Sequence, residues 1–239
     1  MKRTLSLTLA GALTLLTPKT MSLDQMLYES NINSIKQERL ITPNNFEQMY
    51  EYSPNNLSRY KRWINETIDY SRIHNDFAVI IDKEAYELQL YKNGEIFLTF
   101  PVELSISPIE AKVIEWDGRV PEGRYSVMVK KGPKEETKSI FYKAFLIDYP
   151  NKEDKERFES LKIIGRISEN IISPGSAIEI HGHGSGKGIA GNNWTIGCIA
   201  VSNEQMDTLF RYVREGTPVI IVKYGVKDLS FYQELHKKS

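Results

Sequence analysis

The chain has 239 residues, enough for one hydrophobic core plus an accessory segment. Lysine plus arginine and aspartate plus glutamate both number 31, so the formal net charge is +0. Such a chain offers no basic surface for nucleic acid, and we expect no nucleic-acid partner. Its one cysteine, Cys198, excludes an intramolecular disulfide framework and a multi-cysteine zinc or iron–sulfur site.

The first residues have the layout of a secretory signal peptide. Met1-Lys2-Arg3 is positively charged, residues 5–16 are apolar, and Thr17-Pro18-Lys19 ends the apolar stretch. A transmembrane helix needs about 20 apolar residues, so this stretch is too short to span a bilayer. We therefore expect residues 1–22 to be a signal peptide that directs export to the periplasm or cell envelope, with no stable membrane span. A buried N-terminal helix is the structural alternative.

Residues 23–76 are expected to form a helical lead-in that packs on the main domain. Within it, apolar residues recur at spacings of three and four, which is typical of one face of an amphipathic helix. These residues are Leu57, Tyr60, Ile64 and Ile68, joined by Trp63. Nothing in this segment indicates chemistry.

From Phe77 the hydrophobic period changes to two, which predicts β-strands. The strands are expected at residues 77–82, 86–90, 96–100, 125–129, 141–147, 177–181, 198–201 and 219–222. Asn93-Gly94 predicts a hairpin, because both central positions of such a turn need positive φ. The charged stretch 151–159 is expected to be a solvated loop or a short helix.

One late helix is predicted from Met206 to Val213. Ser202 and Gln205 have the spacing of an N-terminal capping box, and Gly216 marks the end. The strands and helices do not alternate as in a doubly wound sheet. The expected fold is therefore mainly β, with this late helix and the N-terminal helical segment.

The candidate chemistry lies where two histidines precede the cysteine. His181 and His183 begin a segment with five glycines among residues 182–193, and they lie 17 and 15 residues before Cys198. Because they differ by two positions, both point to one face of an extended strand. A loop of this length can bring the thiol beside one imidazole, which would give a nucleophilic thiolate–imidazolium pair. The N–H groups near Gly197 and Cys198 could then hold an oxyanion.

Two other interpretations of these residues stay open at this point. His181, His183 and Cys198 are three plausible zinc ligands, although no acidic residue accompanies them in the glycine-rich loop. Alternatively, they are a core cysteine and two histidines hydrogen-bonded in a turn. The remaining histidines, His74 and His236, are expected on the surface.

Residues 178–203 resemble the signature of the L,D-transpeptidase catalytic domain. In that signature a strand ends in His-Gly, a glycine-containing loop follows, and Ser/Thr-x-Gly-Cys closes the motif. His181-Gly182 resembles the first part and Thr195-Ile196-Gly197-Cys198 the second. The turn at 118–125, the stretch 148–151 and the closing segment 216–220 resemble further parts of the family, so that the resemblance covers about residues 77–223.

The resemblance implies an L,D-transpeptidase-type β-sandwich or barrel over residues 77–223, followed by a C-terminal tail at 224–239. It implies that Cys198 is the nucleophile and His181 the general base, without metal or organic cofactor. It assigns oxyanion or substrate binding to Gly197, Thr195 and His183. The chain departs from many members at Ile196, where they have histidine, and at Ala200, where they have arginine.

The resemblance also implies a reaction on peptidoglycan stem peptides. Cys198 would attack the L-centre carbonyl of the diamino acid, and an amine would resolve the thioester, forming a cross-link or attaching an envelope protein. A thiol amidase or carboxypeptidase of the same fold, which hydrolyses such linkages, is the first alternative. A catalytically silent wall-binding module is an alternative of another class.

Overall fold

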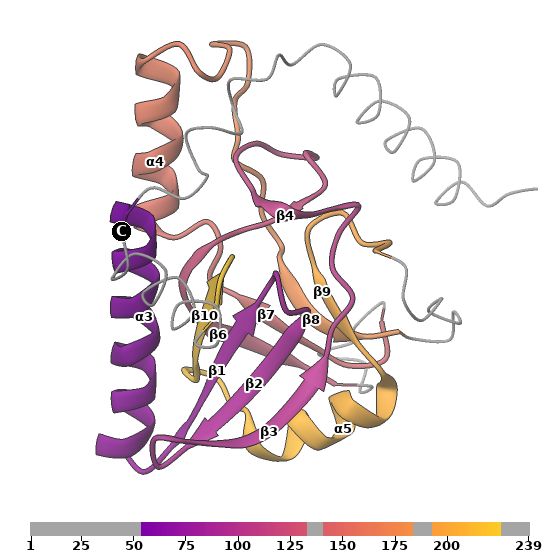
Figure 1. Cartoon of the computed structure of the whole chain (residues 1–239). Helices are drawn as coiled ribbons and strands as arrows, with labels where there is room; N and C mark the ends of the chain where they lie inside the picture. The colour runs from indigo at the N-terminus through magenta and orange to yellow at the C-terminus, as the bar shows by residue number, and fades with distance from the viewer. Residues whose placement is uncertain (1–53, 133–140, 184–192, 226–239) are drawn as a thin grey trace, which may run out of the picture.

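A computed structural model describes residues 54–132, 141–183 and 193–225 (Figure 1). The expected signal peptide at residues 1–22, the first part of the helical lead-in, His236 and nearly all of the C-terminal tail lie outside these residues. Within the described ranges, no helix is long and apolar enough to cross a membrane.

The helical lead-in ends in one long helix, α3 (Pro54–Ile73), which lies along one side of the sheet (Figure 1). Tyr60, Trp63 and Ile64 are buried against strand residues, and Leu57 and Ile68 pack beside them. The amphipathic face predicted from the spacing is therefore confirmed. His74, just beyond the helix, is exposed as expected.

Ten strands form most of the rest of the described residues. They are β1 (Phe77–Asp82), β2 (Glu87–Lys92), β3 (Glu95–Pro101), β4 (Ser107–Ala111), β5 (Arg119–Val120), β6 (Gly123–Lys131), β7 (Ala144–Ile147), β8 (Glu179–Gly182), β9 (Ile199–Val201) and β10 (Pro218–Val222). Eight of them form one sheet in the order β3-β2-β1-β10-β6-β7-β8-β9, while β4 and β5 pair separately. The predicted hairpin joins β2 to β3, with φ of 56° at Asn93 and 82° at Gly94.

The chain that leaves β3 nearly closes this sheet into a barrel. Glu103 pairs antiparallel with Ala200 of β9, and Ser105 pairs with Thr195. Residues 102–106 thereby connect β3 and β9, the two outer strands of the sheet. The expected mainly β architecture, with an N-terminal helix and a late helix, is confirmed.

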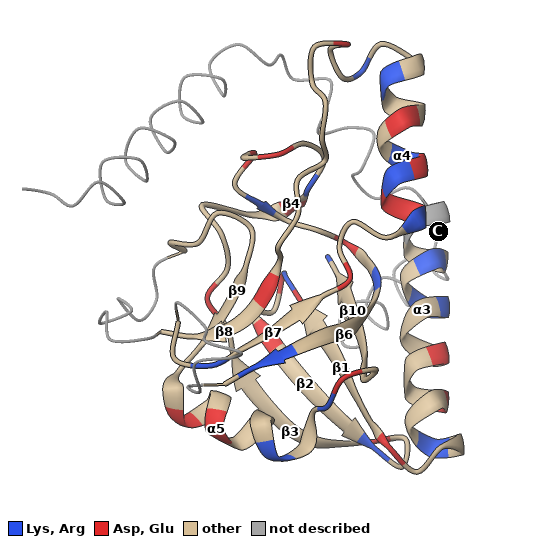
Figure 2. Ribbon diagram, turned by 180° about the vertical axis from the view of Figure 1, so that it is seen from behind, with Lys and Arg blue, Asp and Glu red and all other residues tan. Residues whose placement is uncertain are grey.

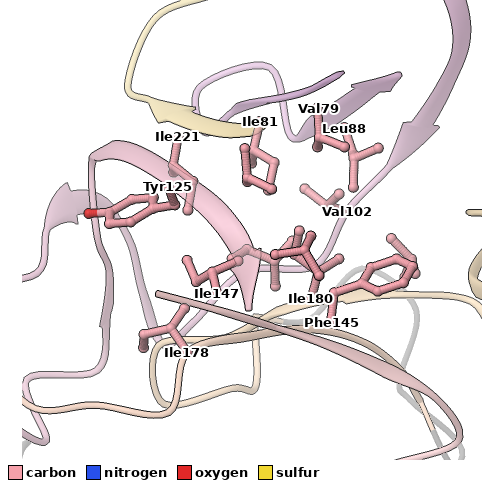
Figure 3. Packing of buried hydrophobic residues seen from close by; sticks show 14 of the residues in the cluster. Val79, Ile81, Leu88, Val102, Tyr125, Phe145, Ile147, Ile178, Ile180 and Ile221 are labelled. Carbon is pink, nitrogen blue, oxygen red and sulfur yellow. The ribbon is translucent and has the colours of Figure 1, made fainter. Parts of the chain in front are cut away.

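The interior is filled by branched and aromatic side chains from facing walls (Figure 3). Val79, Ile81 and Leu88 meet Ile147 and Ile180, all of them nearly without exposure to solvent. The late helix α5 (Asn203–Tyr212) covers one opening with Met206 and Leu209, and begins at the predicted Ser202–Gln205 capping box.

The charged stretch at 151–159 is a helix rather than a loop. It belongs to α4 (Lys152–Ile163), which begins at an Asn151–Asp154 capping box. Phe158 and Leu161 are buried in a small cluster of their own, so the segment is not simply solvated. Figure 2 shows that acidic and basic residues alternate along α4, whereas in α5 the acidic residues come first and the basic residue lies at the end.

Three strands near the candidate site begin later than the sequence predicts. β7 begins at Ala144 instead of residue 141, β8 at Glu179 instead of residue 177, and β9 directly after Cys198. At Ala177 the φ angle is 57°, which is incompatible with an extended strand. β4 and β5 were not predicted, and β5, with two residues, is too short to show a readable alternation.

Candidate active site

Pairing between β8 and β9 places His181 and Cys198 on one face of the sheet. The strands are parallel, with Ile180 opposite Ile199 and His181 opposite Ala200. Both isoleucines point into the core, so His181 and the residue two before Ala200, which is Cys198, point to the other face. The structure thus brings together the two residues that the sequence analysis singled out.

The thiol of Cys198 lies against the backbone at the start of β8. The N–H of Glu179 donates to Sγ at 3.4 Å, and Sγ lies 3.8 Å from the carbonyl oxygen of Ala177, to which the thiol donates. Cys198 is partly exposed, and it is a free cysteine. An N–H directed at sulfur favours a thiolate once one forms.

Gly197 occupies a position that other residues tolerate poorly. Its φ is 133°, and a Cβ there would lie 3.0 Å from the carbonyl oxygen of Arg119 and 3.1 Å from Cδ1 of Ile178. The requirement for glycine before the cysteine is therefore steric as well as conformational.

Thr195 is buried, and its hydroxyl donates to the carbonyl oxygen of Cys198 at 2.7 Å. Its backbone is held as well, because its carbonyl accepts from the N–H of Ile106 at 3.0 Å. These bonds fix the turn from Thr195 to Cys198. Thr195 thus positions the cysteine, whereas the sequence analysis assigned it to oxyanion or substrate binding.

His181 has no exposed surface, and its ring is held in one orientation. Nδ1 lies 2.9 Å from the carbonyl oxygen of Gly182, and a carbonyl only accepts, so Nδ1 carries the proton. Nε2 is consequently the nitrogen with the lone pair, and it has no hydrogen-bond partner among the described residues. This is the tautomer that a general base requires.

Two aromatic rings enclose the His181 imidazole. Phe141 stacks on it with centroids 3.7 Å apart and planes 8° from parallel. Trp194 meets it edge-on at 5.6 Å. Phe141 lies just before β7, outside the strand that the sequence predicted, and this position allows its ring to cover the imidazole.

His183 stands beside a carboxylate rather than beside the thiol. Its Nε2 lies 3.3 Å from Oε2 of Glu103, and the same oxygen accepts from the indole N–H of Trp194 at 2.6 Å. Glu103 and Trp194 are site residues that the sequence analysis missed. The Asn-Trp before the Thr-x-Gly-Cys motif was a usable signal for Trp194, but nothing in the sequence connects Glu103 to this region.

The protonation states differ from the predicted thiolate–imidazolium pair. Burial raises the pKa of the Cys198 thiol to about 12, against the opposing effect of the Glu179 N–H. Burial also lowers the pKa of His181 to about 4. At neutral pH the proton therefore stays on sulfur and the imidazole is neutral. Both shifts disfavour the expected preformed ion pair in the free protein, because burial disfavours the charged form of each group.

Among residues 54–132, 141–183 and 193–225, no three histidine, cysteine or acidic side chains are grouped as metal ligands. His183 faces Glu103, and the Cys198 sulfur is engaged with backbone groups of residues 177 and 179. The described geometry therefore gives no support to the zinc interpretation of these side chains.

Comparison with known families agrees with this arrangement. The model of the L,D-transpeptidase catalytic domain, YkuD, matches residues 76–221, more than half of the chain. The chain belongs to the L,D-transpeptidase family. No curated protein matches the sequence.

Several solved structures are similar to this L,D-transpeptidase-family chain. Bd1075 of Bdellovibrio bacteriovorus is 21% identical, with a TM-score of 0.45, and the match covers 72% of this chain and 57% of that one. The helical cell shape determining protein Pgp2 of Campylobacter jejuni is 21% identical, with a TM-score of 0.46 and coverage of 70% and 56%. An L,D-transpeptidase from Mycobacterium smegmatis is 13% identical, with a TM-score of 0.39 and coverage of 61% and 58%. This chain thus spans less than two thirds of the length of each.

The geometry at Gly197 predicts a sharp effect of a single methyl group. In Gly197→Ala, the new Cβ meets Arg119 and Ile178, so the turn that carries Cys198 must shift. We expect the melting temperature to fall by several degrees, because overpacking of this kind costs about 1–3 kcal/mol. The measurement is differential scanning calorimetry.

Gly165→Ala is the matched control for that variant. Gly165 also has positive φ, at 71°, but nothing lies within 4 Å of an added Cβ. It shares the backbone strain without the crowding, so its melting temperature should fall less than that of Gly197→Ala. Equal losses in the two variants would contradict the steric argument.

The protonated thiol predicts slow alkylation of the free protein. Iodoacetamide reacts with the thiolate, so the rate at Cys198 at pH 7–8 should be more than about tenfold below that of a cysteine in an unstructured peptide, whose thiol has a pKa of about 8.5. The rate should keep rising with pH beyond 9, as long as circular dichroism reports a folded protein. An alkylation rate that stops rising below pH 8 would support the thiolate–imidazolium interpretation instead.

Proposed function

We propose that this protein is a cysteine acyltransferase of the cell wall, with Cys198 as nucleophile and His181 as general base. The observation that carries the proposal is the buried His181 ring, on the sheet face that also carries Cys198. Its Nδ1 proton is donated to Gly182, and its Nε2 has no hydrogen-bond partner among the described residues. A buried, unpartnered acceptor costs free energy and is retained where chemistry uses it. The substrate class, peptidoglycan stem peptides, comes from the family.

The first half of the reaction forms a thioester. The Cys198 sulfur attacks the L-centre carbonyl of the diamino acid at position three of a stem tetrapeptide, while Nε2 of His181 takes the thiol proton. N–H groups near Gly197 and Cys198 stabilise the oxyanion. The carbon–nitrogen bond to D-alanine then breaks, and protonated His181 returns its proton to the leaving amine.

The second half restores the thiol. An amine from another stem peptide, or from an envelope protein, attacks the thioester carbonyl and gives its proton to His181. The carbon–sulfur bond breaks and the sulfur recovers a proton. Because the resting pair is neutral, proton transfer accompanies attack instead of preceding it. Neither half requires a metal or an organic cofactor.

Water as the acceptor gives a carboxypeptidase or amidase in place of a transferase. Product analysis distinguishes these reactions, because transfer yields a new amide and hydrolysis yields a free carboxylate. His183 and Glu103 lie on the same side of the site as His181, with Trp194 between them. We assign His183 to substrate binding and reserve base catalysis for His181.

Removal of the nucleophile tests the proposal. Cys198→Ala should lose at least about three orders of magnitude of turnover on muropeptides, with an unchanged melting temperature, because a small side chain in a turn contributes little packing. Wild-type protein should gain the mass of the acyl group, and Cys198→Ala should not. Retention of a tenth of the activity, equivalent to about 1.4 kcal/mol of barrier, would overturn the assignment.

His181→Gln is the companion variant, and it separates base catalysis from thiol activation. Turnover should fall strongly, whereas alkylation of the free protein should change only a few-fold, since the resting thiol has no imidazolium to lose. His183→Gln should act mainly on KM. If neither histidine variant affects turnover and neither wild type nor Cys198→Ala is acylated, a silent wall-binding module is the better description.

Export to the periplasm or cell envelope is part of the proposal, because the substrate polymer lies there. Residues 1–22 would direct it as a signal peptide. Deletion of residues 5–16 should therefore leave the protein in the cytoplasm, as measured by fractionation and immunoblotting against a cytoplasmic marker. Unchanged envelope localisation of the deletion variant would rule out this role of the segment.

A further inference from the structure

Strand register aligns five residues in one row across the candidate site. Lys131 of β6 pairs with Ala144 of β7, Ala144 pairs with His181, His181 pairs with Ala200, and Ala200 pairs with Glu103. Paired residues of neighbouring strands point to the same face. The row therefore places a cation at one end, a carboxylate at the other, and His181 at the centre between two alanines.

The two neighbours of His181 in this row are small residues. Ala144 and Ala200 are fully buried and carry only a methyl group each. Neighbouring strands are about 4.8 Å apart, so Lys131 stands about two strand spacings from His181. An extended lysine side chain bridges a large part of that distance.

The Lys131 ammonium rests next to the nucleophile. Its Nζ lies 2.5 Å from Oε1 of Glu179, and the backbone N–H of the same glutamate donates to Cys198 Sγ. Glu179 thus contacts the Lys131 ammonium with its side chain and the Cys198 sulfur with its backbone N–H. The ion pair is on the thiol's own side of the sheet.

A second lysine lies near Cys198, and its environment differs. The Lys112 side chain is 3% exposed, and its Nζ donates to the carbonyl of Ile114 and to Asp117, both at 2.9 Å. The Lys112 side chain therefore stabilises the turn that contains Ile114 and Asp117. The Lys131 side chain is 29% exposed and has Glu179 as its ion-pair partner. Of these two cations, Lys131 is the one placed to contact a ligand.

We propose that Lys131 is a specificity-determining residue that binds a carboxylate of the acyl-donor peptide by exchanging its ion pair with Glu179. The inference rests on the proposed function, which supplies a donor rich in carboxylates. In the free protein Glu179 competes for the Lys131 ammonium. Substrate binding therefore breaks the ion pair between Lys131 and Glu179 and forms a new one between Lys131 and the substrate carboxylate. Lys131→Met and Glu179→Gln are therefore expected to change KM in opposite directions.

The experiment uses the full chain and a set of stem tetrapeptide donors. Each donor has one of its carboxylates converted to the primary amide. Acylation of Cys198 is followed by intact-protein mass spectrometry, and kcat and KM are determined for each donor. Wild-type protein should show a KM at least about tenfold higher for one of the amidated donors, the loss expected for a charge-assisted hydrogen bond.

In Lys131→Met, KM for the unmodified donor should rise by about the same factor, and the discrimination at that carboxylate should vanish, with kcat changed less. Lys131→Arg should recover most of the discrimination. Glu179→Gln should lower KM for the unmodified donor. Lys143→Met is the matched control, because Lys143 is also part-buried and ion-paired at 2.5 Å, but to Asp207 of α5; its kinetics should equal wild type.

Undiminished discrimination in Lys131→Met, or a rise of KM in both Lys131→Met and Glu179→Gln, would overturn the inference and leave the ion pair as a structural contact. Absence of discrimination in wild type would overturn it too. These results differ from failure of the proposed function, in which wild-type Cys198 forms no acyl adduct with any donor.

Discussion

The parallel pairing of β8 with β9 is the constraint on which the candidate site depends. A register of Ile180 with Ile199 sends hydrophobic side chains into the core and leaves Glu179, His181 and Cys198 on the opposite face. A slip by one residue would bury the imidazole side among the isoleucines and expose the core residues. Burial of apolar surface and assembly of the candidate site are therefore specified by the same pairing.

Closure of the barrel contributes the remaining site residues. The segment after β3 pairs with β9 and brings Glu103 beside Trp194 and His183.

A buried network connects α3 to the strands on the opposite side of the sheet. Lys83 Nζ pairs with Glu122 at 2.9 Å, and Glu122 also accepts from the hydroxyl of Tyr60. Breaking one partner of such a buried pair leaves an uncompensated charge, so the network favours one docking position for the helix.

Local sequence patterns predicted local structure well. Asn93-Gly94, the Ser202–Gln205 capping box and the spacing from Tyr60 to Ile68 each encode a turn, a helix start or a buried face within a few residues. The family motif identified His181 and Cys198, which lie in neighbouring strands. The contact between Glu103 and Trp194 joins residues 91 positions apart, and no local pattern carries such information.

The sequence could not predict the protonation states of His181 and Cys198, for a related reason. A histidine and a cysteine with motif spacing suggest an ion pair, but the charge on each depends on how completely the fold removes water from it. Here Phe141 and Trp194 enclose the imidazole, and the sulfur lies against backbone, so both groups stay neutral. The motif identified the participants, and long-range packing determined their resting state.

A protonated resting thiol has a consequence for the chemical survival of the protein. Thiolates react with peroxides and disulfides far faster than thiols do, and a lone cysteine has no neighbouring thiol to rescue it after oxidation. Because burial raises the pKa of the Cys198 thiol, the sulfur of the free protein is expected to be oxidised more slowly than that of an unperturbed cysteine.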